Sequence, residues 1–131
     1  MKMRTIKIGD YGNLIPFWKE NYFVTEMDNL ERFKLFLKKN PELSVLMEDG
    51  GKIVGTVLGS FDGRRGYLQK IVTDKNFRKK GIAKKLVEEI IVRLRKLGTL
   101  YIPISCEVEY AEFYSKCGFK KTEQVPMNIN L

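Results

Sequence analysis

The stretch Arg78-Lys79-Lys80-Gly81-Ile82-Ala83 lies where an apolar strand pattern ends and an amphipathic helix pattern begins. Residues 67–73 before it are rich in β-branched and aromatic types, and apolar residues recur at helical spacing from Ile82 to Leu97. A glycine at such a junction lets the backbone approach a ligand, and the first N–H groups of the helix stay unpaired at the positive end of its dipole. The stretch therefore predicts a turn that binds phosphate.

The spacing within this turn separates it from two common phosphate-binding loops. The chain contains neither the G-x-x-x-x-G-K-[ST] pattern of a P-loop nor the G-x-G-x-x-G pattern of a dinucleotide site. The remaining pattern, Arg-x-x-Gly-x-Ala after a strand, resembles the pyrophosphate-binding signature of the GNAT acetyltransferases, which bind acetyl-coenzyme A.

Two further stretches strengthen this resemblance. Residues 55–67 are similar to the strand, turn and strand that precede the signature in a bacterial and archaeal GNAT subgroup, and residues 113–119 match the family motif F-Y-x-K-x-G-F. The similarity is close from Ser44 onward, whereas residues 1–43 match only in general layout.

Turn residues and hydrophobic periodicity predict the order β-α-α-β-β-β-α-β-α-β in one domain, residues 1–131. This order gives an α/β fold of the α+β type, with a mixed, mostly antiparallel sheet and helices on both faces, which is also the GNAT fold that the resemblance implies. Helices are expected after Asp10, after Asp28 with Glu31 at capping-box spacing, from Ile82, and around Tyr110 to Lys116. The expected strands are Arg4 to Ile8, Leu43 to Glu48, Lys52 to Phe61, Tyr67 to Thr73, Thr99 to Cys106 as a buried strand, and one or two strands within Phe119 to Leu131.

Composition limits the classes of site. A chain of 131 residues with 44% hydrophobic content and no long apolar run predicts one cytoplasmic domain that does not enter a membrane. The chain has no histidine, which excludes a Ser-His-Asp triad and a conventional zinc site, so we expect no metal. Cys106 and Cys117 are interpreted as reduced, largely buried thiols.

The net charge of +8 indicates an anionic partner. Coenzyme A carries a pyrophosphate and a further phosphate, which fits basic residues around the turn. Nucleic acid is the competing partner, but the aromatic residues follow apolar stripes instead of alternating with the basic cluster, so we do not expect a base-stacking surface. The basic cluster comprises Lys75, Arg78, Lys79, Lys80, Lys84 and Lys85.

The GNAT resemblance implies a cofactor site. By position, the backbone of Ile71, Val72 and Thr73 would pair with the pantetheine arm in the gap between two splayed strands. The side chains of these three residues are also typical of an ordinary core strand. Any role in binding the cofactor would therefore rest on their backbone groups. The pyrophosphate would lie on the turn formed by Arg78, Lys79, Lys80, Gly81, Ile82 and Ala83.

The resemblance also implies catalytic groups for transfer of an acetyl group to an amine. The backbone N–H of Val72 aligns with the family's oxyanion donor, and Tyr114 takes the place of the tyrosine that protonates the coenzyme A thiolate. A structural role for Tyr114 stays open, because it belongs to an apolar stripe with Tyr110, Phe113 and Cys117.

The general base is not fixed by the sequence. Many relatives have asparagine where this chain has Glu107, which puts a contact to the cofactor in doubt and makes Glu107 the first catalytic candidate. The other candidates are Glu109, Glu26, Asp28, and Gln69 as a residue that orients water.

We therefore expect an N-acetyltransferase that transfers an acetyl group directly from acetyl-coenzyme A to a primary amine of a small molecule. The alternatives are acetylation of a peptide N-terminus or a protein lysine, and a non-catalytic regulator that binds an acyl-coenzyme A. The expected partner is a small-molecule amine, with a homodimer left open.

Overall fold

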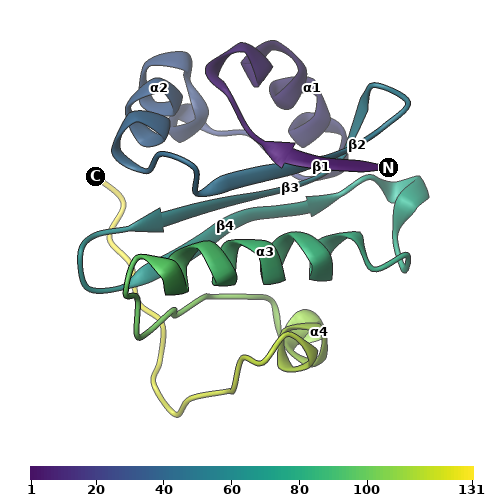
Figure 1. Ribbon diagram of the computed structural model, residues 1–131. Coiled ribbons are helices and arrows are strands. Elements are labelled where there is room, and N and C mark those ends of the chain that lie inside the picture. The colour runs from purple at the N-terminus through teal and green to yellow at the C-terminus, as the bar shows by residue number, and fades with distance from the viewer.

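The computed structural model describes residues 1–131, which fold as helices layered on both faces of one sheet (Figure 1). The sheet is antiparallel with the order β1-β2-β3-β4. The strands are β1 (Lys2–Thr5), β2 (Ser44–Asp49), β3 (Lys52–Phe61) and β4 (Gly66–Thr73). The helices are α1 (Tyr11–Asn21), α2 (Leu30–Lys39), α3 (Ile82–Lys96) and α4 (Ala111–Lys116), with short 3-10 helices η1 (Ile8–Asp10), η2 (Glu26–Asp28), η3 (Lys75–Phe77) and η4 (Val108–Tyr110).

Two hydrophobic clusters cover the two faces of the sheet. On one face, α1 and α2 bury Leu14, Trp18 and Phe33 against the strands. On the other face, α3 buries an apolar stripe that includes Leu86 and Ile90. Both faces of the central strands are therefore covered, which explains why β2 and β3 read as nearly continuous apolar runs.

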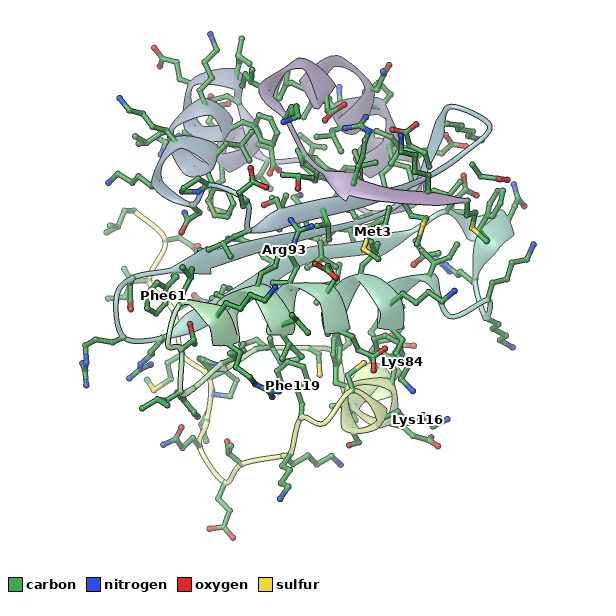
Figure 2. The ribbon with its side chains drawn as sticks, viewed as in Figure 1. Met3, Phe61, Lys84, Arg93, Lys116 and Phe119 are labelled. Carbon is green, nitrogen blue, oxygen red and sulfur yellow. The ribbon has the colours of Figure 1, made fainter.

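Helix α3 lies close to the sheet because a glycine in β3 leaves room for it. A Cβ atom at Gly55 would lie 2.7 Å from Cγ2 of Ile82, so a side chain at this position would push the start of α3 away. Met3 of β1 and Arg93 of α3 extend into the same layer (Figure 2). Arg93 donates to Oγ1 of Thr5 at 2.9 Å, and this bond ties α3 to β1.

Thr99 to Cys106 does not form the buried strand that the sequence predicts. Its backbone pairs with β4 only near its start, through a 3.0 Å hydrogen bond from the Gly66 N–H to the Tyr101 carbonyl. Pro103 has no N–H to offer a ladder, and the segment then separates from β4, which leaves the outer edge of that strand free. The expectation of largely buried thiols is also wrong for Cys106, which is exposed.

The strands expected within Phe119 to Leu131 are absent as well. The N–H of Phe119 donates to Tyr114, and no backbone–backbone hydrogen bond follows it. Apolar residues alternate there, but Val125 and Met127 are 78% and 90% exposed, since no neighbouring strand pairs with the segment. Strand propensity without a partner backbone does not produce a strand.

The start of α2 and the end of β1 also differ from expectation. Asn29 caps α2 by accepting from the Arg32 N–H at 2.9 Å, so the predicted capping box of Asp28 with Glu31 is wrong. Asp28 instead closes a capping box with Thr25 in η2. The first strand also ends earlier than predicted, at Thr5.

Candidate active site

A β-bulge in β4 shapes the site. The register between β3 and β4 shifts so that Val57 stands opposite two residues, Lys70 and Ile71. Lys70 takes the left-handed conformation with φ of 51°, which is uncommon for a residue with a side chain. The extra residue reverses the alternation of the strand, so that Leu68 and Ile71 pack on the α3 side while Val72 packs on the α1 side.

A buried hydrogen-bond chain holds this bulge. The hydroxyl of Thr56 donates to the Lys70 carbonyl at 2.9 Å and accepts from Nε1 of Trp18 at 3.0 Å. Thr56 and Trp18 are both fully buried. A carbonyl that the bulge leaves without a ladder partner is thereby satisfied from the core of the α1 side.

The Lys70 side chain ties the bulge to the loop between α1 and α2. Its Nζ donates to the Phe23 carbonyl at 2.7 Å and lies 3.0 Å from Oδ2 of Asp28. The same nitrogen lies 5.1 Å from the ring centre of Trp18 and 5.4 Å from that of Tyr22. The ammonium group is thus surrounded by aromatic faces and oxygen acceptors, and its side chain is 9% exposed.

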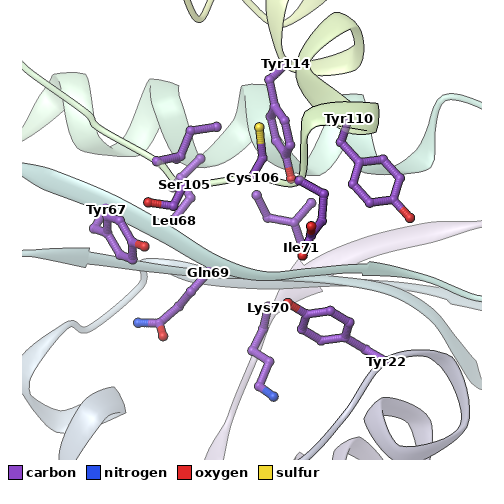
Figure 3. A pocket seen from close by; sticks show the side chains of 12 residues that line it. Tyr22, Tyr67, Leu68, Gln69, Lys70, Ile71, Ser105, Cys106, Tyr110 and Tyr114 are labelled. Atoms are coloured by element: carbon purple, nitrogen blue, oxygen red, sulfur yellow. The ribbon is translucent and has the colours of Figure 1, made fainter. Parts of the chain in front are cut away.

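A cavity of about 350 Å³ opens between β4 and the segment that separates from it. Tyr114 of α4 and Tyr22 enter it from different sides, with their hydroxyl groups toward Ile71 at the bulge (Figure 3). We call this space the central cavity. It is lined by Tyr22, Tyr67, Leu68, Gln69, Lys70, Ile71, Ile104, Ser105, Cys106, Glu107, Tyr110 and Tyr114.

The backbone of β4 presents its free edge to this cavity. Because the Asp74 N–H donates to the Val54 carbonyl at 2.9 Å, the ladder pairs Val72 with Thr56 of β3. Peptide groups alternate along a strand, so those of Ile71 and Thr73 face the free edge. By this alternation the Val72 N–H points toward β3 and the Ile71 N–H points toward the central cavity.

The basic turn lies at the far end of β4, where α3 begins (Figure 1). Lys79 and Gly81 have φ of 63° and 78°, and no side chain caps the first N–H groups of α3. A Cβ atom at Gly81 would meet no atom within 4 Å, so the glycine serves a left-handed turn beside open space. An uncapped helix start behind such a turn presents several N–H groups to an anion.

Tyr114 is held in its neutral form. Burial raises the pKa of Tyr114 above that of an exposed tyrosine, and Cys106 and Cys117 add to the effect. Its ring packs edge-on against Phe113 and Phe119, with centroid distances of 5.0 and 6.0 Å. A neutral phenol fixed by packing is suited to donate a proton.

The candidate carboxylates have separate surroundings. Glu107 lines the central cavity, and its charge contributes to the raised pKa of Tyr22, after burial of that phenol. Asp28 is occupied by Lys70 and by the Thr25 N–H, while Glu26 accepts from Asn29. Glu109 is not among the residues that line the cavity. Of these four acids, Glu107 is the one that lines the central cavity.

Comparison with known proteins identifies the family. The model of the acetyltransferase (GNAT) family matches residues 12–119. The chain belongs to the GNAT acetyltransferase family. It is an acyltransferase with the fold of that family.

A plant enzyme is similar to this GNAT chain both in sequence and in structure. A glucosamine 6-phosphate N-acetyltransferase of Arabidopsis thaliana is 36% identical over 56 residues, which cover 43% of this chain and 38% of the relative. A crystal structure of the Arabidopsis enzyme superposes with a TM-score of 0.77 at 25% identity, covering 98% of this chain and 97% of the other.

One further sequence and one further solved structure are similar to this chain. An acetyltransferase of Pectobacterium atrosepticum is 28% identical over 99 residues, covering 75% of this chain and 70% of its own. A Mycobacterium tuberculosis protein crystallised in complex with CoA has a TM-score of 0.75 at 17% identity, covering 98% and 76% of the two chains, and it shares the fold.

The GNAT motifs in the sequence predict only some of the residues that line the central cavity. Ile71, Glu107 and Tyr114 all line it, whereas Arg78 to Ala83 form a separate turn. Sequence reasoning missed Tyr22 and Tyr67 as lining residues. The spacing of these two residues in the sequence does not indicate a shared site. Tyr22 follows the end of α1, whereas Tyr67 lies in β4, and only the fold brings them together.

This GNAT chain shows neither a helix that could span a membrane nor a cluster of metal-ligating side chains. None of its helices combines the length and the apolar character needed to cross a bilayer. No group of three or more His, Cys, Asp or Glu residues is placed to hold a metal ion.

Proposed function

We propose that the protein transfers an acetyl group from acetyl-coenzyme A directly to a primary amine of a small molecule. The observation that carries this proposal is the central cavity, which brings the free edge of β4, the neutral Tyr114 phenol and the Glu107 carboxylate together. Acyl transfer needs an oxyanion donor, an acid and a base, and the cavity offers one candidate for each.

The residues present fit a coenzyme A donor. The uncapped start of α3 and the turn from Arg78 to Ala83 would hold the pyrophosphate, and the open space at Gly81 leaves room for it. The free edge of β4 at Ile71 and Thr73 would pair with an extended amide-bearing arm, as an added strand does. The Mycobacterium tuberculosis protein crystallised in complex with CoA has this fold.

Each group in the cavity has a distinct role in the proposal. Acetyl-coenzyme A supplies an activated thioester. The Ile71 N–H at the free edge of β4 stabilises negative charge on the carbonyl oxygen, and Tyr114 donates its proton to the departing thiolate. Glu107, directly or through water, accepts the proton that the attacking amine must lose.

The test couples binding with turnover. Calorimetry should show that acetyl-coenzyme A binds at micromolar affinity, and a panel of amines should release free thiol only when the protein and an acceptor are both present. Absence of binding would overturn the cofactor assignment. Binding without thiol release for any amine, peptide or protein acceptor would indicate a regulator that binds acyl-coenzyme A.

Peptide or protein acceptors remain the second candidate for the acceptor. A second cavity, lined by Phe23 and residues of α2, shares Tyr22, Gln69 and Lys70 with the central cavity, and the two together would admit an extended chain. Mass spectrometry of peptides incubated with the donor distinguishes this candidate, because acetylation would appear on an N-terminus or a lysine.

A further inference from the structure

A second cavity of about 440 Å³ lies on the α2 side of β4 and adjoins the central cavity. The two cavities share Tyr22, Gln69 and Lys70 in their walls. Gln69 and Lys70 extend from β4 away from Tyr114, toward this side (Figure 3). We call this space the α2 groove. A ligand that reaches Tyr114 through the α2 groove would lie across the bulge.

One stripe of α2 faces the groove. Arg32, Phe36 and Lys39 line it at i, i+4 and i+7, which places them on the same side of the helix. Seven residues of helix extend about 10 Å, so the two cationic side chains flank an apolar centre. Both cations are on exposed parts of the helix.

The charges that line the groove are unbalanced. Asp28 is its only carboxylate, and Lys70 already pairs with it at 3.0 Å. Arg32 and Lys39 have no carboxylate within 4.0 Å and donate no side-chain hydrogen bond to another residue. The groove therefore carries two uncompensated positive charges beside a neutral pair.

The central cavity has the opposite character. Its free acid is Glu107, accompanied by the phenols of Tyr22, Tyr110 and Tyr114. A protonated amine is favoured at that end and disfavoured at the α2 groove, whereas an anionic group is favoured in the groove. The two ends together select a molecule with charge of each sign.

An apolar wall joins the two ends. Tyr22 and Phe23 pack with ring centres 4.1 Å apart, and Met27 and Leu35 stand 73% and 52% exposed at the rim. A saturated or sugar-like spacer could pack on this wall while its ends meet the charges.

We propose that the acceptor is an amine that also carries an anionic group, a phosphate or a carboxylate, and that Arg32 and Lys39 bind this group in the α2 groove. This inference rests on the proposed acetyl transfer for the role of the amine end. The binding of the anionic end follows from the charges and shape of the groove.

The experiment measures binding of matched ligands to the whole chain in the presence of coenzyme A, so that no turnover is required. Aminohexanol, aminohexanoate and aminohexyl phosphate share one spacer and differ only in the end group. We expect both anionic amines to bind at least about tenfold more tightly than the alcohol. The difference between carboxylate and phosphate identifies which anion the site prefers.

Two variants and a control assign the effect to the groove. Arg32→Gln and Lys39→Gln should each weaken binding of the anionic amines by about tenfold and leave aminohexanol unchanged. Lys34→Gln removes the same charge from α2 but lies outside the groove, so it should change neither. Circular dichroism checks that all three variants remain folded.

Several results would overturn the inference. These are equal binding of the alcohol and the anionic amines, no binding of any of the three, or unchanged affinity in both groove variants. Thiol release with aminohexanol as fast as with its anionic analogues would refute it while leaving acetyl transfer intact. Charge-dependent binding that both groove variants weaken would leave the groove assignment standing even if no acceptor in the amine, peptide and protein panel released thiol, a result that would refute only the proposed activity.

Discussion

The hydroxyl of Thr56 lies 2.9 Å from the carbonyl oxygen of Lys70 and donates a hydrogen bond to it. This bond joins β3 to the one residue of β4 that adopts a left-handed conformation. Because Thr56 also accepts from Trp18, a single side chain connects helix α1, the strand pair and the bulge beside the central cavity. The position of Ile71 at the free edge depends on this bulge.

The first prediction concerns this buried hydroxyl. Thr56→Val keeps the shape of the side chain but leaves the Lys70 carbonyl and the Trp18 N–H without partners. Unfolding in urea should show a loss of about 1–3 kcal/mol of stability, the usual cost of an unsatisfied buried group. Thr56→Ser keeps the hydroxyl and serves as the control, with a smaller loss from the missing methyl group. Equal stability of the valine variant and the wild type would show that the bulge does not need this bond.

The second prediction concerns the pair of Lys70 and Asp28. Both side chains are largely buried, at 9% and 11% exposure, so removing one charge leaves the other without compensation. Lys70→Met should cost about 3 kcal/mol or more and loosen the loop between α1 and α2. The expected signs are a lower unfolding midpoint and faster amide exchange in residues 22–29.

A double-mutant cycle separates this pair from general packing. Asp28→Asn combined with Lys70→Met should cost less than the sum of the single changes, because the second change removes a charge that the first left unpaired. Additive losses would mean that the Phe23 carbonyl and the aromatic rings, and not Asp28, dominate the surroundings of Lys70.

The fold could be predicted from the sequence as far as Gly98, because each element up to that residue is indicated by the sequence pattern of its own segment. The helix from Ile82 carries a continuous apolar stripe, and Asp49-Gly50-Gly51 marks a hairpin, so each pattern determines its own element. Beyond Gly98 the apolar segments needed a partner strand, and sequence alone cannot show that Thr99 to Cys106 separates from β4 after one hydrogen bond.

The site could be predicted only where a motif marks it. The motif around Phe113 gave Tyr114, and the basic turn gave Gly81, since both depend on short-range spacing. Tyr22, at the end of α1, and Arg32, in α2, come from the layer of helices on the face of the sheet away from α3. The bulge at Lys70 is a shift in strand register, and no pattern in the sequence marks it. Long-range packing determines these positions.

The third prediction tests Glu107 as the proton acceptor. Glu107→Gln should lower kcat/KM by up to about 10²-fold with a verified acceptor, because an amide cannot take the proton from the amine. Glu109→Gln is the matched control, two residues away and outside the lining of the central cavity. If the two variants behave alike between pH 6 and 9, the proton leaves through water held by Gln69 and backbone groups.

The fourth prediction concerns the turn before α3. Gly81→Glu should abolish binding of acetyl-coenzyme A, since it places bulk and negative charge where the pyrophosphate is expected. Gly81→Ala meets no atom within 4 Å, so we expect only the strain of a left-handed residue, about 1–2 kcal/mol. Gly98→Ala provides the control at the other end of α3, where φ is 87° and no ligand is expected. Calorimetry should show a loss of affinity for Gly81→Glu and nearly unchanged affinity for Gly81→Ala and Gly98→Ala; equal affinity in Gly81→Glu would place the pyrophosphate elsewhere.

The last prediction concerns Tyr114. Tyr114→Phe removes one hydroxyl with little change in packing, so kcat should fall by about 10²-fold while the affinity for acetyl-coenzyme A stays nearly unchanged. Because burial raises the pKa of this phenol, it stays protonated at every pH below the ordinary tyrosine value of 10.0. The wild-type kcat should therefore show no alkaline decline from Tyr114 below that pH.

The same raised pKa predicts a difference in stability that does not depend on activity. The unfolded chain releases the Tyr114 proton near its ordinary value of 10.0, while the folded protein retains it, so the wild type loses stability as the pH rises above this value. Tyr114→Phe lacks this group and should lose less stability over the same range, measured by urea unfolding at pH 9 and above pH 10. Parallel losses in the two proteins would show that the phenol is as free to ionise in the fold as in water. An unchanged kcat in Tyr114→Phe, with chemistry shown to be rate-limiting, would leave Tyr114 with only a structural role.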